Sequence, residues 1–321
     1  MDIIEQAAKR LEELRRSGAD VPPESSPPNG SDKSIERPRQ TAAPSADTAP
    51  ASVQQVSRLI ELNMSTLAAH GIITPDAVRS QLADEMRVIK RPLLNNAEGK
   101  GAAPIRDANL IMITSAVPQE GKTTIAANLA MSIAMELDHT VLLVDADVAR
   151  PNLPNVFGFG HQKGLLDLLL DPSLDPSEVL LRTNIEKLSI LPSGTQHPRA
   201  TELLASDAMN QRLADLASRY SDRIIIFDSP PLLVTTESRA LAAHMGQVVV
   251  VVRADSTRHS EVRHALATIE ACPVKMVVLN QATGSLDGHG YGYGYGYGYR
   301  GYGYGHEQGG AKPSKRGEAR V

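Results

Sequence analysis

One stretch of this sequence has the residue types and spacing to bind a polyphosphate. Residues 115 to 124 read SAVPQEGKTT, and the apolar run IAANLAMSIAMEL follows them. Glycine-lysine-threonine at this spacing ends a P-loop, in which backbone N–H groups and a helix N-terminus wrap phosphate. Ala116 stands where the first glycine usually lies. The spacing predicts a nucleotide-binding loop made of Ala116, Val117, Pro118, Gln119, Glu120, Gly121, Lys122, Thr123 and Thr124.

Three aspartates follow apolar runs and could complete such a site. Asp145 comes directly after LLV, Asp147 lies two residues further on, and Asp228 follows the run IIIF. Because parallel strands bind ligands at their carboxyl ends, these side chains should lie at one edge of a sheet. Aspartate also favours ordinary strand-to-loop junctions, which is the alternative reading of each one alone. Beside a P-loop they indicate a magnesium–ATP site, with Lys122 on the β- and γ-phosphates and the Thr123 hydroxyl and Asp228 at the metal.

A third group lies near the C-terminus, in GYGYGYGYGYRGYGYG from Gly290 to Gly305. It holds seven of the eight tyrosines of a chain that has three phenylalanines and no tryptophan. Glycine resists ordering, so these rings are not spaced for packing. An adhesive low-complexity segment is one interpretation. The other is a flexible row of phenolic hydroxyls: Tyr291, Tyr293, Tyr295, Tyr297, Tyr299, Tyr302 and Tyr304.

The elements that must position these groups are apolar runs of strand length separated by helical stretches. Continuous apolar strands alternating with helices are typical of a parallel sheet covered on both faces. We therefore predict an α/β, P-loop NTPase domain over residues 99–284, with a mostly parallel sheet flanked by helices. The expected strands are Leu110–Thr114, Val141–Val144, Leu188–Leu191, Ile224–Phe227, Val248–Val252 and Lys275–Leu279.

Four further segments are predicted around this domain. Residues 1–18 have the spacing of an amphipathic helix, either a docking helix or a marginal surface helix. Residues 19–52, rich in Pro, Ser and Ala, indicate a disordered linker. Residues 53–98 indicate two helices, 53–69 and 75–91; Thr74 would cap the second and Pro92 would end it. Residues 285–321 form the flexible tyrosine tail.

Composition narrows the class of protein. The net charge of −4 over 321 residues provides no basic field, so nucleic acid is not an expected partner. A single cysteine, Cys272, excludes an internal disulfide framework and fits a reducing cytosol. No apolar run approaches the roughly 18 residues that span a bilayer. We expect a cytoplasmic protein; if it works at a membrane, a partner must recruit it to the inner face.

The motifs SxxPxEGKTT, VLLVDADxxRP and IIxDxPP, followed by a tyrosine cluster, resemble the bacterial tyrosine kinases. This resemblance covers residues 80–305. The related partition and septum-placement ATPases carry an extra lysine where this chain has Val117, which favours the kinase branch. The stretches IIEQAAKRLEEL and EMRVIKRPLLNNA are also similar to the tyrosine autokinases encoded with exopolysaccharide and exosortase loci.

The resemblance implies a role for each motif residue. Lys122 would neutralise phosphate charge, Asp145 would accept the tyrosine proton, and Asp147 would assist at the metal. Asn280 would read the adenine, and Arg150 is a weaker candidate for a phosphate or interface contact. Many family members build a ring through a Glu-x2-Arg-x2-Arg helix. The nearest match here is the set Asp84, Arg87 and Lys90, in which lysine lacks the bidentate fork of arginine.

The resemblance also implies the reaction and its partners. The implied cofactors are ATP and Mg²⁺. The implied assembly is a homo-oligomer that could be a ring. The implied partner proteins are a separate membrane-anchored activator of the chain-length-determinant type and a tyrosine phosphatase. The expected activity is ATP-dependent autophosphorylation of the tail in trans, serving exopolysaccharide production and export. Two alternatives remain at this point: a non-kinase P-loop ATPase that controls assembly or placement, and a nucleotide-regulated binding module.

Overall fold

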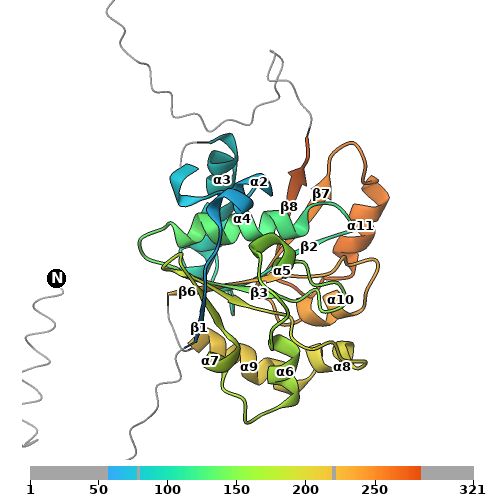
Figure 1. The fold of residues 1–321 in the computed structure, drawn as a ribbon. Coiled ribbons are helices and arrows are strands. Elements are labelled where there is room, and N and C mark those ends of the chain that lie inside the picture. The colour runs from blue at the N-terminus through green and yellow to red at the C-terminus, as the bar shows by residue number, and fades with distance from the viewer. Residues whose placement is uncertain (1–56, 78–79, 219–221, 283–321) are drawn as a thin grey trace, which may run out of the picture. The chain divides into compact units, whose positions relative to one another are not determined.

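The computed structural model describes residues 57–77, 80–218 and 222–282. The predicted N-terminal helix, the linker and the tyrosine tail lie outside these described residues. Within them, a single sheet runs through the middle and helices cover both of its faces (Figure 1). The α/β architecture predicted from the apolar runs is confirmed.

Eight strands form the sheet, in the order β1-β4-β5-β3-β6-β2-β7-β8. Every neighbouring pair is parallel except β4 and β5. The register pairs Asp145, the last residue of β3, with Asp228, the last residue of β6. The strands are β1 Arg58–Ile60, β2 Leu110–Ser115, β3 Thr140–Asp145, β4 Leu181–Thr183, β5 Leu188–Leu191, β6 Arg223–Asp228, β7 Gln247–Arg253 and β8 Val274–Asn280.

Helices connect most of these strands. On one face lie α2 Met64–Ala69, α3 Gln81–Ala97, α4 Lys122–Ala134 and α5 Leu153–Phe157. The other face carries α6 Leu165–Leu170, α7 Pro176–Val179, α8 Ala200–Leu204, α9 Asp207–Ser218, α10 Glu237–Ala242 and α11 His259–Ala267. A short 3₁₀ turn, η1, spans Pro75–Ala77. No helix of the described residues is long and apolar enough to cross a bilayer.

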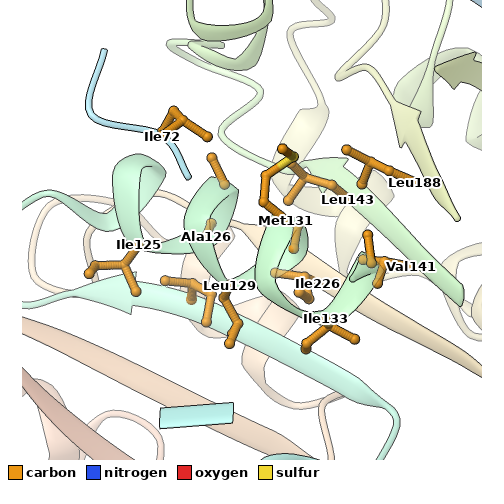
Figure 2. Close-up of a cluster of buried hydrophobic side chains, with 14 of the residues drawn as sticks. Ile72, Ile125, Ala126, Leu129, Met131, Ile133, Val141, Leu143, Leu188 and Ile226 are labelled. Carbon is orange, nitrogen blue, oxygen red and sulfur yellow. The ribbon is translucent and has the colours of Figure 1, made fainter. Parts of the chain in front are cut away.

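Side chains of the central strands point alternately to the two faces of the sheet and contribute to a hydrophobic core on each face. In β2, Ile111 and Ile113 point to the α4 face, while Leu110 and Met112 point to the α9 face. This follows from the two-residue period of a strand and explains why both sets are apolar. The helix α4 lies in the first core; its Leu129 and neighbours pack against side chains of β3 and β6 (Figure 2).

The predicted helix over 53–69 is confirmed at residues 64–69 and is wrong at residues 58–60. Residues 58–60 form β1, an edge strand parallel to β4. A helix starts only at Met64, where the Asn63 side chain accepts the backbone N–H groups of Ser65 and Thr66. Tertiary pairing with β4 therefore overrides the helical spacing of the sequence at residues 58–60.

The second predicted helix begins and ends later than expected. Its N-cap is Ser80 rather than Thr74, because the Ser80 hydroxyl accepts the Ala83 N–H. The helix α3 continues through Pro92 to Ala97. Pro92 is exposed, so the hydrogen bond that it cannot make lies on the solvent side. Burial of Leu93 and Leu94 holds the last turns in place.

The compact part of the chain is larger than the sequence indicates. Leu67 of α2 and Met86 of α3 belong to the same hydrophobic core as α4 and the central strands. The side chain of Asn128, buried on α4, accepts the Ile73 N–H and donates to the Gly71 carbonyl. The segment before the first central strand is thus bonded directly to the helix that carries the P-loop.

Candidate active site

The loop between β2 and α4 presents a row of unused backbone donors. Gly121 is the N-cap of α4 and has φ 90°, a left-handed conformation that glycine adopts without strain. The six backbone N–H groups from Gln119 to Thr124 donate no hydrogen bond to the described residues. Unpaired amides at a helix N-terminus form an anion site, so the loop has the geometry that polyphosphate binding requires.

The Lys122 side chain crosses from the loop to the end of β3. Its ammonium lies 2.9 Å from Oδ2 of Asp147, and both side chains are largely buried. The other oxygen of Asp147 accepts the Arg150 N–H at 3.1 Å. The Asp147 carboxylate therefore pairs with the Lys122 ammonium in the absence of phosphate and keeps it at the site.

Two more carboxylates lie at the same edge of the sheet, where they are buried and lack hydrogen-bond partners for some of their oxygens. Asp145 and Asp228 are fully buried and are register partners on neighbouring strands. Asp145 accepts the Leu153 N–H through Oδ2, but Oδ1 has no hydrogen-bond partner. Neither oxygen of Asp228 accepts a hydrogen bond of normal geometry from the described residues. Buried unpaired polar atoms are unfavourable and mark sites that a ligand completes.

The surroundings raise the pKa values of both Asp145 and Asp228. Burial, and then the charge of Asp228, raise the pKa of Asp145 to about 8. Burial also raises the pKa of Asp228 to about 6, against the opposing effects of the Lys122 charge and the Thr123 hydroxyl. Adjacent acids with raised pKa values in a concave site are typical of functional centres.

These residues fit a magnesium ion bound together with phosphate. The unpartnered oxygens of Asp228 and the hydroxyl of Thr123 lie at the phosphate side of the sheet. Among the described residues, no group of three His, Cys, Asp or Glu side chains could hold a metal by itself. Mg²⁺ usually binds one or two carboxylates and completes its shell with substrate phosphates and water. The donor set therefore suits Mg²⁺ on a nucleotide.

A hollow of about 650 Å³ opens over the loop. Lys122, Thr123, Asp147 and Arg150 are among the residues that line it. Pro231 and Val234, after β6, form apolar parts of the lining. A volume of this size lies within the usual range for small-ligand sites. Asp145 and Asp228 lie deeper and do not line the hollow themselves.

Two of the sequence-predicted residues, Val117 and Asn280, have other contacts in this structure. The Val117 N–H donates to the Glu120 carboxylate, and Pro118 has no N–H to offer. Asn280 donates from its side-chain amide to the Glu120 carbonyl at 2.9 Å and is not among the residues lining the hollow. Its contact with adenine therefore stays a prediction, and so do the nucleotide contacts of Val117 and Pro118.

The predicted interface residues on α3 separate into two environments. Asp84 is exposed, Arg87 is half-buried, and the two are paired with each other. Lys90 is buried instead; its ammonium lies 2.7 Å from both Oε1 of Glu136 and the Ser132 carbonyl. An interface through Asp84 and Arg87 remains a prediction, whereas Lys90 already bonds within its own subunit.

Sequence reasoning missed the contribution of the β7–α11 loop. Thr257 and the Arg253 N–H both donate to the carboxylate of Glu120. Asn152 and Asn155 line the hollow from the segment after β3 and were also not singled out. No local signal marks these positions, because their roles depend on which segments the sheet brings to one edge.

The fold and site together have relatives among known proteins. An AAA domain family model matches residues 109–278. "Tyrosine-protein kinase YwqD" of Bacillus subtilis is 32% identical over 172 residues, covering 54% of this chain and 71% of the relative. "Tyrosine-protein kinase wzc" of Salmonella typhimurium is 31% identical over 185 residues, covering 56% of this chain. The match spans only about a quarter of that longer relative, 25%.

Solved structures agree with these matches. The crystal structure of the chimerical protein CapA2B2 has a TM-score of 0.55 and 30% identity, covering 70% of this chain and 92% of the other. The kinase domain of the Escherichia coli tyrosine kinase ETK has a TM-score of 0.52 and 26% identity, covering 72% and 97%.

The chain belongs to the AAA domain family, whose model spans more than half of it. Within that family it belongs to the bacterial tyrosine-protein kinases, as the resemblance of its motifs indicated. The placement-ATPase alternative is not favoured.

Proposed function

We propose that this chain is an ATP-dependent tyrosine autokinase whose acceptors are the seven tyrosines of its own C-terminal segment, Tyr291 to Tyr304. The observation that carries the proposal is the coincidence, at one sheet edge, of unused loop amides, Lys122 and unpaired buried carboxylates. An ATP site of this kind, in a chain with a Gly-spaced tyrosine row, has both substrates of a kinase reaction within one sequence.

Each residue of the site has a proposed role in phosphoryl transfer. The loop amides and Lys122 bind the phosphates of ATP and neutralise their charge. The tyrosine oxygen bonds to the γ-phosphorus as the bond from that phosphorus to the β-phosphate oxygen breaks, releasing ADP. Asp145 accepts the phenolic proton. Thr123, Asp147 and Asp228 would hold Mg²⁺, which supplies positive charge beside the transferring group when bound.

Chain length permits the tail to reach a site. Tyr291 is eleven residues beyond Asn280, a reach of at most about 36–40 Å. Four strand-to-strand steps separate β8 from β3, which is about 19 Å. The first acceptor can therefore approach Asp145 of its own subunit or of a neighbour. We propose the neighbour, because Asp84 and Arg87 expose a polar face of α3 for assembly.

Charge explains how phosphorylation would end an assembly. Each phosphate adds about −1.5 to −2, so seven would add roughly −10 to −14. Tails with such charge repel one another, which favours release of subunits from the proposed ring-shaped oligomer. A tyrosine phosphatase would then reset the tail.

The partner proposal rests on the motif resemblance to the bacterial tyrosine kinases. We propose that a separate membrane-anchored activator recruits this cytoplasmic kinase to the membrane and that the cycle serves exopolysaccharide production and export. The relatives named CapB and EpsB are putative tyrosine-protein kinases of Staphylococcus aureus and Ralstonia nicotianae. No nucleic-acid partner is proposed.

Labelled ATP with magnesium tests the proposal directly. The wild type should label its tail, Lys122→Met should not, and a variant with all seven tail tyrosines changed to Phe should lose the label. A mixture of Lys122→Met and the seven-Phe variant should restore label on the former if transfer occurs between subunits. An unlabelled wild-type tail, with the activator's cytosolic segment present, contradicts the autokinase. ATP hydrolysis without tyrosine labelling would instead support the placement ATPase.

A further inference from the structure

Glu120 has an unusual position within the phosphate loop. It is only 1% exposed, although a loop glutamate next to a polyphosphate site would ordinarily face solvent. Its Oε2 accepts the Val117 N–H at 2.7 Å. Its Oε1 accepts the Arg253 N–H at 3.1 Å and the hydroxyl of Thr257. The carboxylate therefore turns away from the phosphate side and joins the loop to the segment after β7.

The backbone of the same residue is held from a second strand. The Glu120 carbonyl accepts the side-chain amide of Asn280, the last residue of β8. The Asn280 carbonyl in turn accepts the Ala254 N–H at 2.9 Å. Glu120 is thus clamped through its side chain to the end of β7 and through its carbonyl to the end of β8. We call these contacts the Glu120 clamp.

The clamp determines which loop amides remain for phosphate. The Val117 N–H is used within it, and Pro118 has none, so the unused donors begin at Gln119. Gln119 has φ 66°, a left-handed conformation that is strained for a residue with a side chain. Hydrogen bonds that fix Val117 and Glu120 lie on both sides of Gln119 and oppose its return to a relaxed conformation.

We propose that Glu120 is a positioning residue, which holds the loop amides in their phosphate-binding arrangement through the Arg253–Thr257 segment. The inference rests on the proposed function in that the ligand is a nucleotide. A preformed cradle needs no reorganisation when phosphate binds, so its donors act at full strength. The carboxylate already accepts three hydrogen bonds on the far side of the loop, and it is neither the proton acceptor nor a metal ligand.

Thr257 allows a test that leaves the loop sequence unchanged. Thr257→Val keeps the shape of the side chain and removes one hydrogen bond to Glu120, whereas Thr257→Ser keeps the hydroxyl. The readout is calorimetric titration of the full chain with ADP and Mg²⁺, beside the thermal unfolding midpoint without nucleotide. We expect ADP affinity roughly 3–10-fold weaker for Thr257→Val, the scale of one hydrogen bond. Thr257→Ser should bind within about twofold of wild type.

A second pair of variants separates positioning from general stability. Glu120→Gln places an amide donor against either the Val117 N–H or the Arg253 N–H, so it should weaken ADP binding more than Thr257→Val. The double variant should be no weaker than Glu120→Gln alone, because both act through one contact. The inference is overturned if the two losses add, if Thr257→Val and Thr257→Ser behave alike, or if Thr257→Val lowers only the unfolding midpoint.

Because the readout is ADP binding, the test of the Glu120 clamp can be distinguished from the test of kinase activity. A wild type that binds ADP but never labels its tail contradicts the autokinase. The same titrations then still support the Glu120 clamp if Thr257→Val weakens binding and Thr257→Ser does not.

Discussion

Two regions bury charge in opposite ways. At the phosphate edge, Asp145 and Asp228 are buried with oxygens that lack partners, and their pKa values are raised. At the α3–α4 contact, Lys90 is buried with its ammonium bonded to Glu136 and to the Ser132 carbonyl. Burial alone would raise the pKa of Glu136, yet hydrogen bonding and charge from Lys90 keep it below 4.5.

This difference distinguishes a ligand-binding site, at the phosphate edge, from a structural contact, between α3 and α4. A buried carboxylate without a partner destabilises the free protein and becomes favourable only when a ligand supplies positive charge. A paired lysine holds two helices together and leaves no unmet interaction for a ligand. The edge should therefore respond to nucleotide and metal, and the α3–α4 contact should respond to neither.

The largest effect expected at the edge is from Lys122→Met. Removing the ammonium leaves Asp147 without its charge partner and the phosphates without a neutralising group. We expect tail phosphorylation to fall by at least roughly 100-fold. Labelling with ATP measures the loss, and an unchanged circular dichroism spectrum is the control. Activity within tenfold of wild type would show that Lys122 is not in the site.

At the α3–α4 contact, Lys90→Met should destabilise the fold. The substitution removes the nearer of the two cations that pair with Glu136 and leaves Arg91 at 3.4 Å, so the expected loss is about 1–3 kcal/mol. Urea unfolding of the full chain measures it. Arg87→Met, at a half-buried position of the same helix, is the matched control and should cost less stability than Lys90→Met. If Lys90→Met disrupted assembly at unchanged stability, the interface role of Lys90 would be supported instead.

Asp228→Asn should have the opposite effect on stability. It removes a buried carboxylate that lacks good hydrogen bonds, so the free protein should gain about 1–3 kcal/mol at pH 8, where this group is ionised. Kinase activity should be lost in the same variant. Stabilisation by ATP and Mg²⁺ should also shrink, as thermal unfolding would show. A destabilised free protein would mean that Asp228 has a structural role.

The smallest expected effect concerns pH. The pKa of Glu136 is lower in the folded chain than its ordinary 4.5, so its pairing stabilises the fold above that value. This contribution, about 0.5 kcal/mol, is lost as pH falls through the folded pKa. Glu136→Gln should therefore lose less stability than wild type between pH 5 and pH 3. Parallel acid-unfolding curves would contradict this view of the α3–α4 contact.

Much of the centre of the fold could be predicted because its signals are local. Each central strand is a continuous apolar run, and glycine-lysine-threonine after the first one identifies the loop. The edge elements could not be read in this way. Arg58–Ile60 has helical spacing but pairs with β4, and α3 passes through Pro92 because Leu93 and Leu94 are buried.

By itself, the sequence determined the strand-loop-helix order, the phosphate loop and the three aspartates at strand ends. These depend on residue types and short spacings, which chain connectivity preserves. Only the tertiary structure decided that Glu120 faces the β7–α11 loop, that Asn280 supports the P-loop from behind, and that Lys90 pairs inward. Each of these contacts joins residues more than 40 positions apart, and no local pattern encodes which distant donor meets which acceptor.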